Sequence, residues 1–194
     1  MKLNEIESWK KPRPIKMTDN IFSRIEKLCS DALPAIKETG YIFRGIDGMP
    51  TQFIGVSPEN REPMGVAKDS HNALNVVLRR NGFIANRSNS IFCSGHPWVA
   101  QSYGNLYAIF PINGFHYTWS RTIKDLYFHE EEVNEFIENN SDDTVLKKYH
   151  FNKDAFLSSA IASEREIYIH GKYIALMCSR YKNELFDYFG WYVE

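Results

Sequence analysis

Apolar residues recur every three or four positions in two segments of the first half of the chain, the spacing of a helix that buries one face. The two sets are Ile21, Ile25, Leu28 and Ala32, and Leu74, Val77 and Leu78. We expect Thr18 or Asp19 to cap the first helix and Pro34 and then Gly40 to end it, while Gly82 ends the second. Residues 129–140 predict a third helix with an acidic, solvated face.

Short apolar runs bounded by glycine, proline or asparagine predict strands in the rest of the chain. These runs are residues 41–48, the run before Gly95, and residues 106–111, 115–119, 167–169, 173–177 and 185–193. Asn113-Gly114 and His170-Gly171 are expected to be the turns of two β-hairpins. Residues 47–66 contain three prolines and three glycines without periodicity, and we expect a loop there.

The order of these elements, helices first and then mostly short strands, indicates an α+β fold and not an alternating parallel α/β fold. The 194 residues suffice for one domain with its own core, so we expect residues 1–194 to form a single domain. Residues 1–17 are polar and contain Pro12 and Pro14, which indicates a tail or an extended lead-in to that domain.

Composition narrows the classes of function. The net charge of −1 argues against a protein held mainly by nucleic-acid phosphates, although a local basic patch is compatible with it. The N-terminus lacks the apolar core of a signal peptide, and no run approaches the ~18 apolar residues of a membrane span. Three widely spaced cysteines and six histidines show no disulfide or metal-ligand spacing, so we expect no metal site and a cytoplasmic location.

Three groups of polar residues fall on predicted strands. Arg44 lies inside the first strand, and a later strand ends in a cluster of small polar residues, Ser90, Cys93 and Ser94. Glu164 and Glu166 stand one residue apart before an apolar strand, so both carboxylates point the same way if strand pairing already begins at Glu164. Each group also has a structural interpretation: a buried ion pair for the arginine, turn formation for the small residues, and a solvated strand end for the glutamates.

Taken together and in this order, the motifs resemble those of the mono-ADP-ribosyltransferases of the arginine–serine–glutamate class. The family's aromatic-x-Arg-Gly strand matches YIFRG at residues 41–45. Its Ser-Thr-Ser strand and following helix match IFCSG at 91–95 and AQSY at 100–103. Its Glu-x-Glu strand matches EREIYIHG at 164–171. The resemblance implies a split β-sandwich preceded by helices.

The resemblance also implies an activity and roles for the charged residues. Enzymes of this family cleave the nicotinamide–ribose bond of NAD, which is a co-substrate, and transfer ADP-ribose to an acceptor. Glu166 would stabilise the ribose as positive charge develops on it, and Glu164 would orient and deprotonate the acceptor. Arg44 would hold the dinucleotide phosphates, and Gly45 would offer backbone groups to the nicotinamide amide. The Glu-x-Glu form implies a protein acceptor, with arginine as the target side chain.

The small polar residues depart from the family pattern. Cys93-Ser94-Gly95 stands where the family has Ser-Thr-Ser. The resemblance implies that the first serine positions Glu166, and here that role falls to Cys93, Ser94 or Ser90. Tyr103, on the helix after this strand, is a candidate for stacking on a bound ring, or else an ordinary core aromatic.

The sequence is also compatible with two other hypotheses about function. One is a different enzyme on the same fold: an NAD glycohydrolase, a transferase acting on nucleic acid, or an RNA 2′-phosphotransferase-like enzyme. The other is a binding module without catalysis. Compact enzymes of this family often act as bacterial or phage effectors on host proteins, which would place the protein in the cytoplasm of an infected cell.

Overall fold

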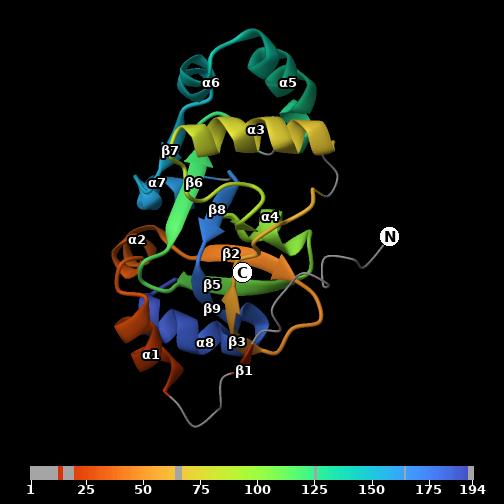
Figure 1. Cartoon of the computed structure of the whole chain (residues 1–194). Helices are drawn as coiled ribbons and strands as arrows, with labels where there is room; N and C mark the ends of the chain where they lie inside the picture. The colour runs from red at the N-terminus through yellow and green to blue at the C-terminus, as the bar shows by residue number, and fades with distance from the viewer. Residues whose placement is uncertain (1–12, 15–19, 64–66, 125, 164, 192–194) are drawn as a thin grey trace.

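Two antiparallel sheets carry the fold of the computed structural model, which describes residues 13–14, 20–63, 67–124, 126–163 and 165–191 (Figure 1). The five-stranded sheet has the order β1-β3-β9-β5-β2, and the four-stranded sheet has the order β4-β8-β6-β7. The strands are β1 (Arg13–Pro14), β2 (Ile42–Ile46), β3 (Gln52–Val56), β4 (Ile91–Cys93), β5 (Asn105–Pro111), β6 (His116–Ser120), β7 (Phe151–Lys153), β8 (Ile167–His170) and β9 (Lys172–Met177). The α+β class is confirmed.

Helices surround the two sheets. They are α1 (Ile21–Leu28), α2 (Leu33–Thr39), α3 (Lys68–Arg80), α4 (Pro97–Gln101), the 3-10 helix η1 (Leu126–His129), α5 (Glu130–Asn139), α6 (Asp142–Lys148), α7 (Leu157–Ile161) and α8 (Cys178–Phe189). Helix α8 lies along the five-stranded sheet, and α3, α5 and α6 lie beyond the far end of the four-stranded one (Figure 1). Within the described residues, no helix has the length and apolar character needed to cross a bilayer.

The first predicted helix is two helices. Asn20 caps α1, its side chain accepting hydrogen bonds from the N–H groups of Phe22 and Ser23, while Thr18 and Asp19 lie outside the described residues. Pro34 does not end this helix but sits in the first turn of α2, where its missing N–H has no intrahelical partner to lose. The periodicity therefore predicted the buried face, and the proline marked a start instead of a stop.

The C-terminal segment is helical where the sequence predicted a strand. Leu185 and Phe189 are buried four residues apart in α8, and the Phe189 ring stacks on Phe110 with 5.3 Å between centroids. Tyr41 donates a hydrogen bond from its hydroxyl to the carbonyl of Leu185 at 2.7 Å. The aromatic content suggested β-structure, but contacts with the sheet fix the helix.

Both predicted hairpins are wrong, because their turns lead from one sheet to the other. Strand β5 pairs with β2 and β9, while β6 pairs with β7 and β8. In the same way, β8 pairs with β4 and β6, while β9 pairs with β3 and β5. Gly114 (φ 80°) and Gly171 (φ 127°) supply the left-handed backbone that these corners require.

Hydrogen bonds to residues elsewhere in the chain hold each corner. The side-chain oxygen of Asn113 accepts from the N–H of Asp31 at 3.0 Å, and its amide donates to Ser30 Oγ at 2.8 Å. At the other corner, Ser57 Oγ accepts from the N–H of Gly171 at 3.0 Å and lies 3.1 Å from Nδ1 of His170. These long-range anchors explain why the local turn signal, which was correct, did not reveal which strands pair.

The expected loop at residues 47–66 contains strand β3. Pairing with β1 on one side and β9 on the other fixes a segment that has little periodicity of its own. Residues 13–14 of the expected tail form β1 against it.

The core divides into two clusters. The larger lies on the five-stranded sheet and on the inward faces of β4, β6 and β8, and a smaller one joins α3 to α5, α6 and the 3-10 helix. Both sheets contribute residues to the larger cluster, consistent with a single folding unit for that part of the chain.

Ser57→Ala is expected to lower the free energy of unfolding by about 0.5–1.5 kcal/mol, because the partly buried N–H of Gly171 loses its hydrogen-bond acceptor. Urea denaturation followed by circular dichroism measures this change. Ser102→Ala, at an exposed serine on α4's C-terminal side, is the control and should change stability by less than about 0.5 kcal/mol. Equal effects of the two substitutions would show that Ser57 does not hold the corner.

Candidate functional site

The three sequence motifs lie on neighbouring strands. Phe43 of β2 and Ser94, just after β4, exchange two backbone hydrogen bonds of 2.7 and 2.9 Å, which join the two sheets at this point. Strand β4 in turn pairs with β8, with Cys93 opposite Ile167. Ser94 is therefore bonded to β2 itself, while Arg44 and Glu166 each adjoin a residue of these pairs, Phe43 and Ile167.

The carboxylate of Glu166 is held by two buried side chains. Arg87 donates from Nη1 to Glu166 Oε2 at 2.9 Å and to the hydroxyl of Tyr168 at 2.7 Å. Tyr168 in turn donates to the same Oε2 at 3.2 Å, since residues 166 and 168 share a face of the strand. The side chain of Glu166 is 16% exposed and that of Arg87 only 4%, so the carboxylate reaches solvent while its cation does not.

The electrostatics of this triangle favour the charged form of Arg87 and the neutral form of Tyr168. Burial by itself lowers the pKa of Arg87, but Tyr168 and Glu166 outweigh it and raise that pKa above the ordinary value. Burial raises the pKa of Tyr168, and Glu166 raises it further against the opposing effect of Arg87. Tyr168 therefore stays a neutral donor to the carboxylate.

An aromatic ring lines the same face. Phe92 packs against Tyr168 with 4.9 Å between ring centroids, and the guanidinium carbon of Arg87 lies 4.6 Å from the centre of the Phe92 ring. The guanidinium carbon of Arg61 lies 3.6 Å from the same ring. Cation–π contact with this partly buried ring helps to keep both arginines in place.

Cys93 lies in the core, on the opposite face of the β4–β8 pair from this triangle, and Arg44 is also buried. Strand alternation places Cys93 with Ile91 and Ile167 in the larger core cluster, and Phe92, Tyr168 and Glu166 on the opposite face. Burial raises the pKa of the Cys93 thiol to about 12, and Arg44 opposes that rise, so its guanidinium lies within electrostatic reach. The motif strands are thus bonded to one another, while the side chains of Cys93 and Glu166 lie on opposite faces of the β4–β8 pair.

The predicted serines make local contacts. Ser94 Oγ accepts from the N–H of His96 at 3.1 Å, which fixes the turn into α4. Ser90 Oγ donates to the side chain of Asn89 at 3.1 Å. Both serines are buried, and the Glu166 carboxylate is bonded to Arg87, which lies outside the sequence motifs, and to Tyr168, which lies within the third motif.

Two glycines in the motifs have a packing cause. A Cβ at Gly45 would lie 1.9 Å from the carbonyl oxygen of Ala100, so α4 approaches β2 across a position that must lack a side chain. A Cβ at Gly95 would lie 1.6 Å from the carbonyl oxygen of Ile161, at the end of α7. The departure from Ser-Thr-Ser at position 95 is thus required by the backbone of α7.

The two remaining predicted site residues are Tyr103 and Glu164. Tyr103 is 66% exposed just beyond α4 and is not a core aromatic. Glu164 lies outside the described residues, so the predicted pairing of the two carboxylates stays a prediction.

Arg87 is a residue of this site that the sequence motifs did not include. Its place in the irregular segment before β4 gave no periodic signal, whereas Tyr168, two residues after Glu166, was predictable as a neighbour from strand alternation.

A buried histidine lies behind the triangle. His71 on α3 is 3% exposed, and burial, with help from Arg87 and Arg61, lowers its pKa from 6.5 to about 4. Its Nδ1, and both amide atoms of Asn75 one turn later, have no hydrogen-bond partner among the described residues. This face of α3 is therefore polar, and it is neutral at physiological pH.

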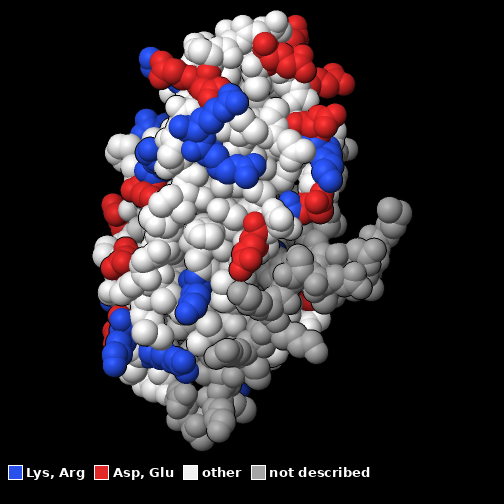
Figure 2. All heavy atoms as spheres, in the orientation of Figure 1, with Lys and Arg blue, Asp and Glu red and all other residues white. Residues whose placement is uncertain are grey.

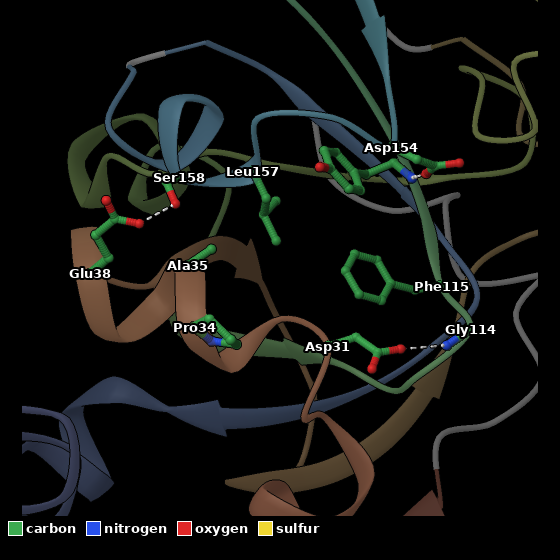
Figure 3. A pocket seen from close by; sticks show the side chains of 10 residues that line it. Asp31, Pro34, Ala35, Glu38, Gly114, Phe115, Asp154, Leu157 and Ser158 are labelled. Carbon is green, nitrogen blue, oxygen red and sulfur yellow. Dashed lines mark hydrogen bonds between the residues drawn. The ribbon is translucent and has the colours of Figure 1, made fainter.

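A separate hollow of about 410 Å³ opens between α2, the Asn113-Gly114 corner and the start of α7 (Figure 3). Three acids line it, and each is engaged: Asp31 accepts from the N–H of Gly114, Glu38 from Ser158, and Asp154 from the N–H of Tyr117. None of the strands that carry Arg44 or Glu166 contributes to its lining. We regard these carboxylates as anchors of the corner.

Within the part of the chain that the structure describes, no three His, Cys, Asp or Glu side chains are grouped to hold a metal ion. The chain matches no protein-family model, no curated protein and no solved structure. Function must therefore be argued from the motifs and from the geometry around Glu166.

Gly95→Ser, which restores the third residue of the family motif, is expected to destabilise the fold by roughly 1–3 kcal/mol or more, because its Cβ meets the backbone of Ile161. Urea denaturation measures the loss. Lys182→Ser on the exposed side of α8 serves as the control and should stay within about 0.5 kcal/mol. A stable Gly95→Ser protein would mean that α7 yields and that the motif departs for another reason.

His71 should make stability fall as the pH drops from about 6.5 to about 4. Its folded-state pKa lies below its unfolded one, so the unfolded chain takes up the proton first, and the cost reaches at most about 3 kcal/mol. Urea unfolding at pH 4.5, 5.5 and 7, compared between the wild type and His71→Gln, isolates this term from the carboxylates that both proteins share. Parallel pH profiles of the two proteins would contradict the assignment.

Proposed function

We propose that this protein is an NAD-dependent mono-ADP-ribosyltransferase in which Glu166 is the catalytic carboxylate. The observation that carries the proposal is the fixed, partly exposed carboxylate of Glu166, held by Arg87 and Tyr168 beside the strands of the other two motifs. Its action would be cytoplasmic, in the producing cell or in an infected one, where NAD is available.

The chemistry suits a carboxylate that is held in place. When the bond between the ribose C1′ and the nicotinamide nitrogen breaks, its electron pair leaves with the ring, so a cationic leaving group departs neutral without a general acid. Positive charge then develops on the ribose, as in glycoside cleavage. A carboxylate that is already oriented stabilises this charge more in the transition state than in the ground state. The two donors on Oε2 supply that orientation.

The remaining roles follow the resemblance. From β2 the buried guanidinium of Arg44 would bind the dinucleotide phosphates, and Gly45 would offer backbone groups to the nicotinamide amide. Glu164 would take the proton of the incoming nucleophile, and the Glu-x-Glu form favours an arginine of a protein as acceptor. Water in place of that acceptor would make the enzyme an NAD glycohydrolase.

One observation favours a non-catalytic alternative. The charge of Glu166 is already balanced by Arg87, an arrangement that also serves as a structural ion pair, and a buried thiol stands at Cys93 where the family has a hydroxyl. A binding module of this kind would bind NAD without releasing nicotinamide.

Glu166→Gln is expected to lower the rate of nicotinamide release from NAD at least about 100-fold, because the amide keeps its shape but cannot stabilise positive charge. Release of nicotinamide is followed by chromatography, and circular dichroism checks the fold. Glu135→Gln, on the exposed side of α5, is the matched control and should keep full activity. Full activity in the Glu166 variant would remove Glu166 from the mechanism.

The acceptor is identified in the same assay. When the protein is incubated with labelled NAD and a cell lysate, the lysate should give a labelled band that protease removes and nuclease does not. Free ADP-ribose without a labelled band would indicate hydrolysis, and NAD binding without nicotinamide release would indicate the binding module.

A further inference from the structure

A second hollow, of about 420 Å³, lies at the edge of the four-stranded sheet, where β7 is the last strand. Its lining residues are Arg121, Leu146, Lys147, His150, Phe151, Asn152 and Phe156. The lining contains two permanent cations and a histidine but no carboxylate, the reverse of the acidic hollow in Figure 3.

The hollow carries an aromatic ring in the open. Phe156 is 58% exposed, and the guanidinium carbon of Arg121 lies 5.0 Å from the centre of its ring. The same guanidinium lies 5.9 Å from the ring of Trp119, so Arg121 sits between two aromatic rings. An exposed ring backed by an arginine is the arrangement on which nucleic-acid bases stack.

The backbone around this ring is held in an unusual conformation. His150, Asp154 and Phe156 have φ of 48°, 47° and 62°, and they are all the non-glycine residues with positive φ in the described chain. For a bulky side chain such as Phe156 this left-handed conformation is unfavourable, and such conformations concentrate at binding sites. It projects the ring outward from the N-cap position of α7.

Other cationic side chains lie on the surface next to the hollow and enlarge the positively charged area. Lys153 of β7 donates from Nζ to the carbonyl of Asn81, at the end of α3, whose last turn carries Arg79 and Arg80. Figure 2 shows Lys and Arg side chains gathered over this end of α3. Lys147 pairs with Asp143, but both are more than 70% exposed, so the pair is weak and an anion can compete for the lysine.

We infer that this hollow, lined by Arg121, Lys147, His150 and Phe156, binds single-stranded nucleic acid. A base would stack on Phe156, and the flanking phosphates would lie against Arg121 and the cations that lead to α3. A single strand is favoured over a duplex because the stacking face of a base is hidden in a duplex. It is favoured over an acidic protein because carboxylates would use the cations but not the exposed ring. This site is independent of the function proposed for Glu166.

The test measures fluorescence anisotropy of a labelled 12-nucleotide single-stranded RNA of mixed sequence against the full chain at 50 and 200 mM salt. Binding in the micromolar range that weakens with salt is expected. Arg121→Gln should weaken binding and reduce the slope of log affinity against log salt by about 0.7, the value for one phosphate on a single strand. Lys182→Gln, an exposed cation on α8, should leave both unchanged.

Phe156→Asn separates binding from folding. Asparagine tolerates the left-handed backbone better than phenylalanine, so this variant should unfold at the same or a higher temperature than the wild type. Its affinity for the RNA should nevertheless fall roughly 5- to 100-fold through the loss of stacking. Trp98→Ala, at a 64% exposed aromatic on α4, should bind RNA as the wild type does.

Three results would overturn the inference. They are no binding of the RNA at 50 mM salt, binding that is indifferent to Phe156→Asn and Arg121→Gln, and displacement of the RNA by poly-glutamate that binds with the same dependence on Phe156. The last result would assign the hollow to an acidic protein segment.

Discussion

Residues 166–177 cross from the four-stranded to the five-stranded sheet at Gly171, and the rest of the structure depends on this crossing. One end of the segment pairs β8 with β4 and β6, and the other places β9 between β3 and β5. A hairpin at Gly171 would use the same residues to close a single sheet, and Glu166 would then have no fixed relation to β2. The anchoring of Gly171 by Ser57 therefore links the fold to the site.

Glu166 gains its character from what surrounds it, more than from the motif around it. A carboxylate at a strand end is ordinarily solvated and mobile, whereas a buried arginine and a buried tyrosine converge on one oxygen of this one. Removing either partner of such a pair would leave an uncompensated charge, so the geometry is maintained by its own electrostatics. The basic hollow at β7 lies at the opposite edge of the same sheet from β4, and it uses exposed aromatic surface in place of a buried ion pair.

Sequence reasoning reached the class of the fold, most strands and the segments of the three motifs, because these depend on local periodicity and turn residues. The predictions were wrong or incomplete where contacts between residues far apart in the sequence determine the structure. Hairpins were predicted at Asn113-Gly114 and His170-Gly171, because the groups that bond these corners belong to the distant residues Ser30, Asp31 and Ser57. The aromatic C-terminal segment became α8 because the sheet stabilises its buried face. Arg87 was missed since an irregular segment gives no pattern that points to a partner 79 residues away.

A crystal structure of the protein with NAD, or with an analogue that resists cleavage, tests the central claim most directly. The account predicts the nicotinamide ribose within hydrogen-bond distance, about 2.6–3.2 Å, of Glu166, with Arg87 still bonded to Oε2 and the phosphates near Arg44. A dinucleotide bound away from Glu166, with the Arg87–Glu166–Tyr168 triangle unchanged, would contradict it and leave the triangle as a structural ion pair.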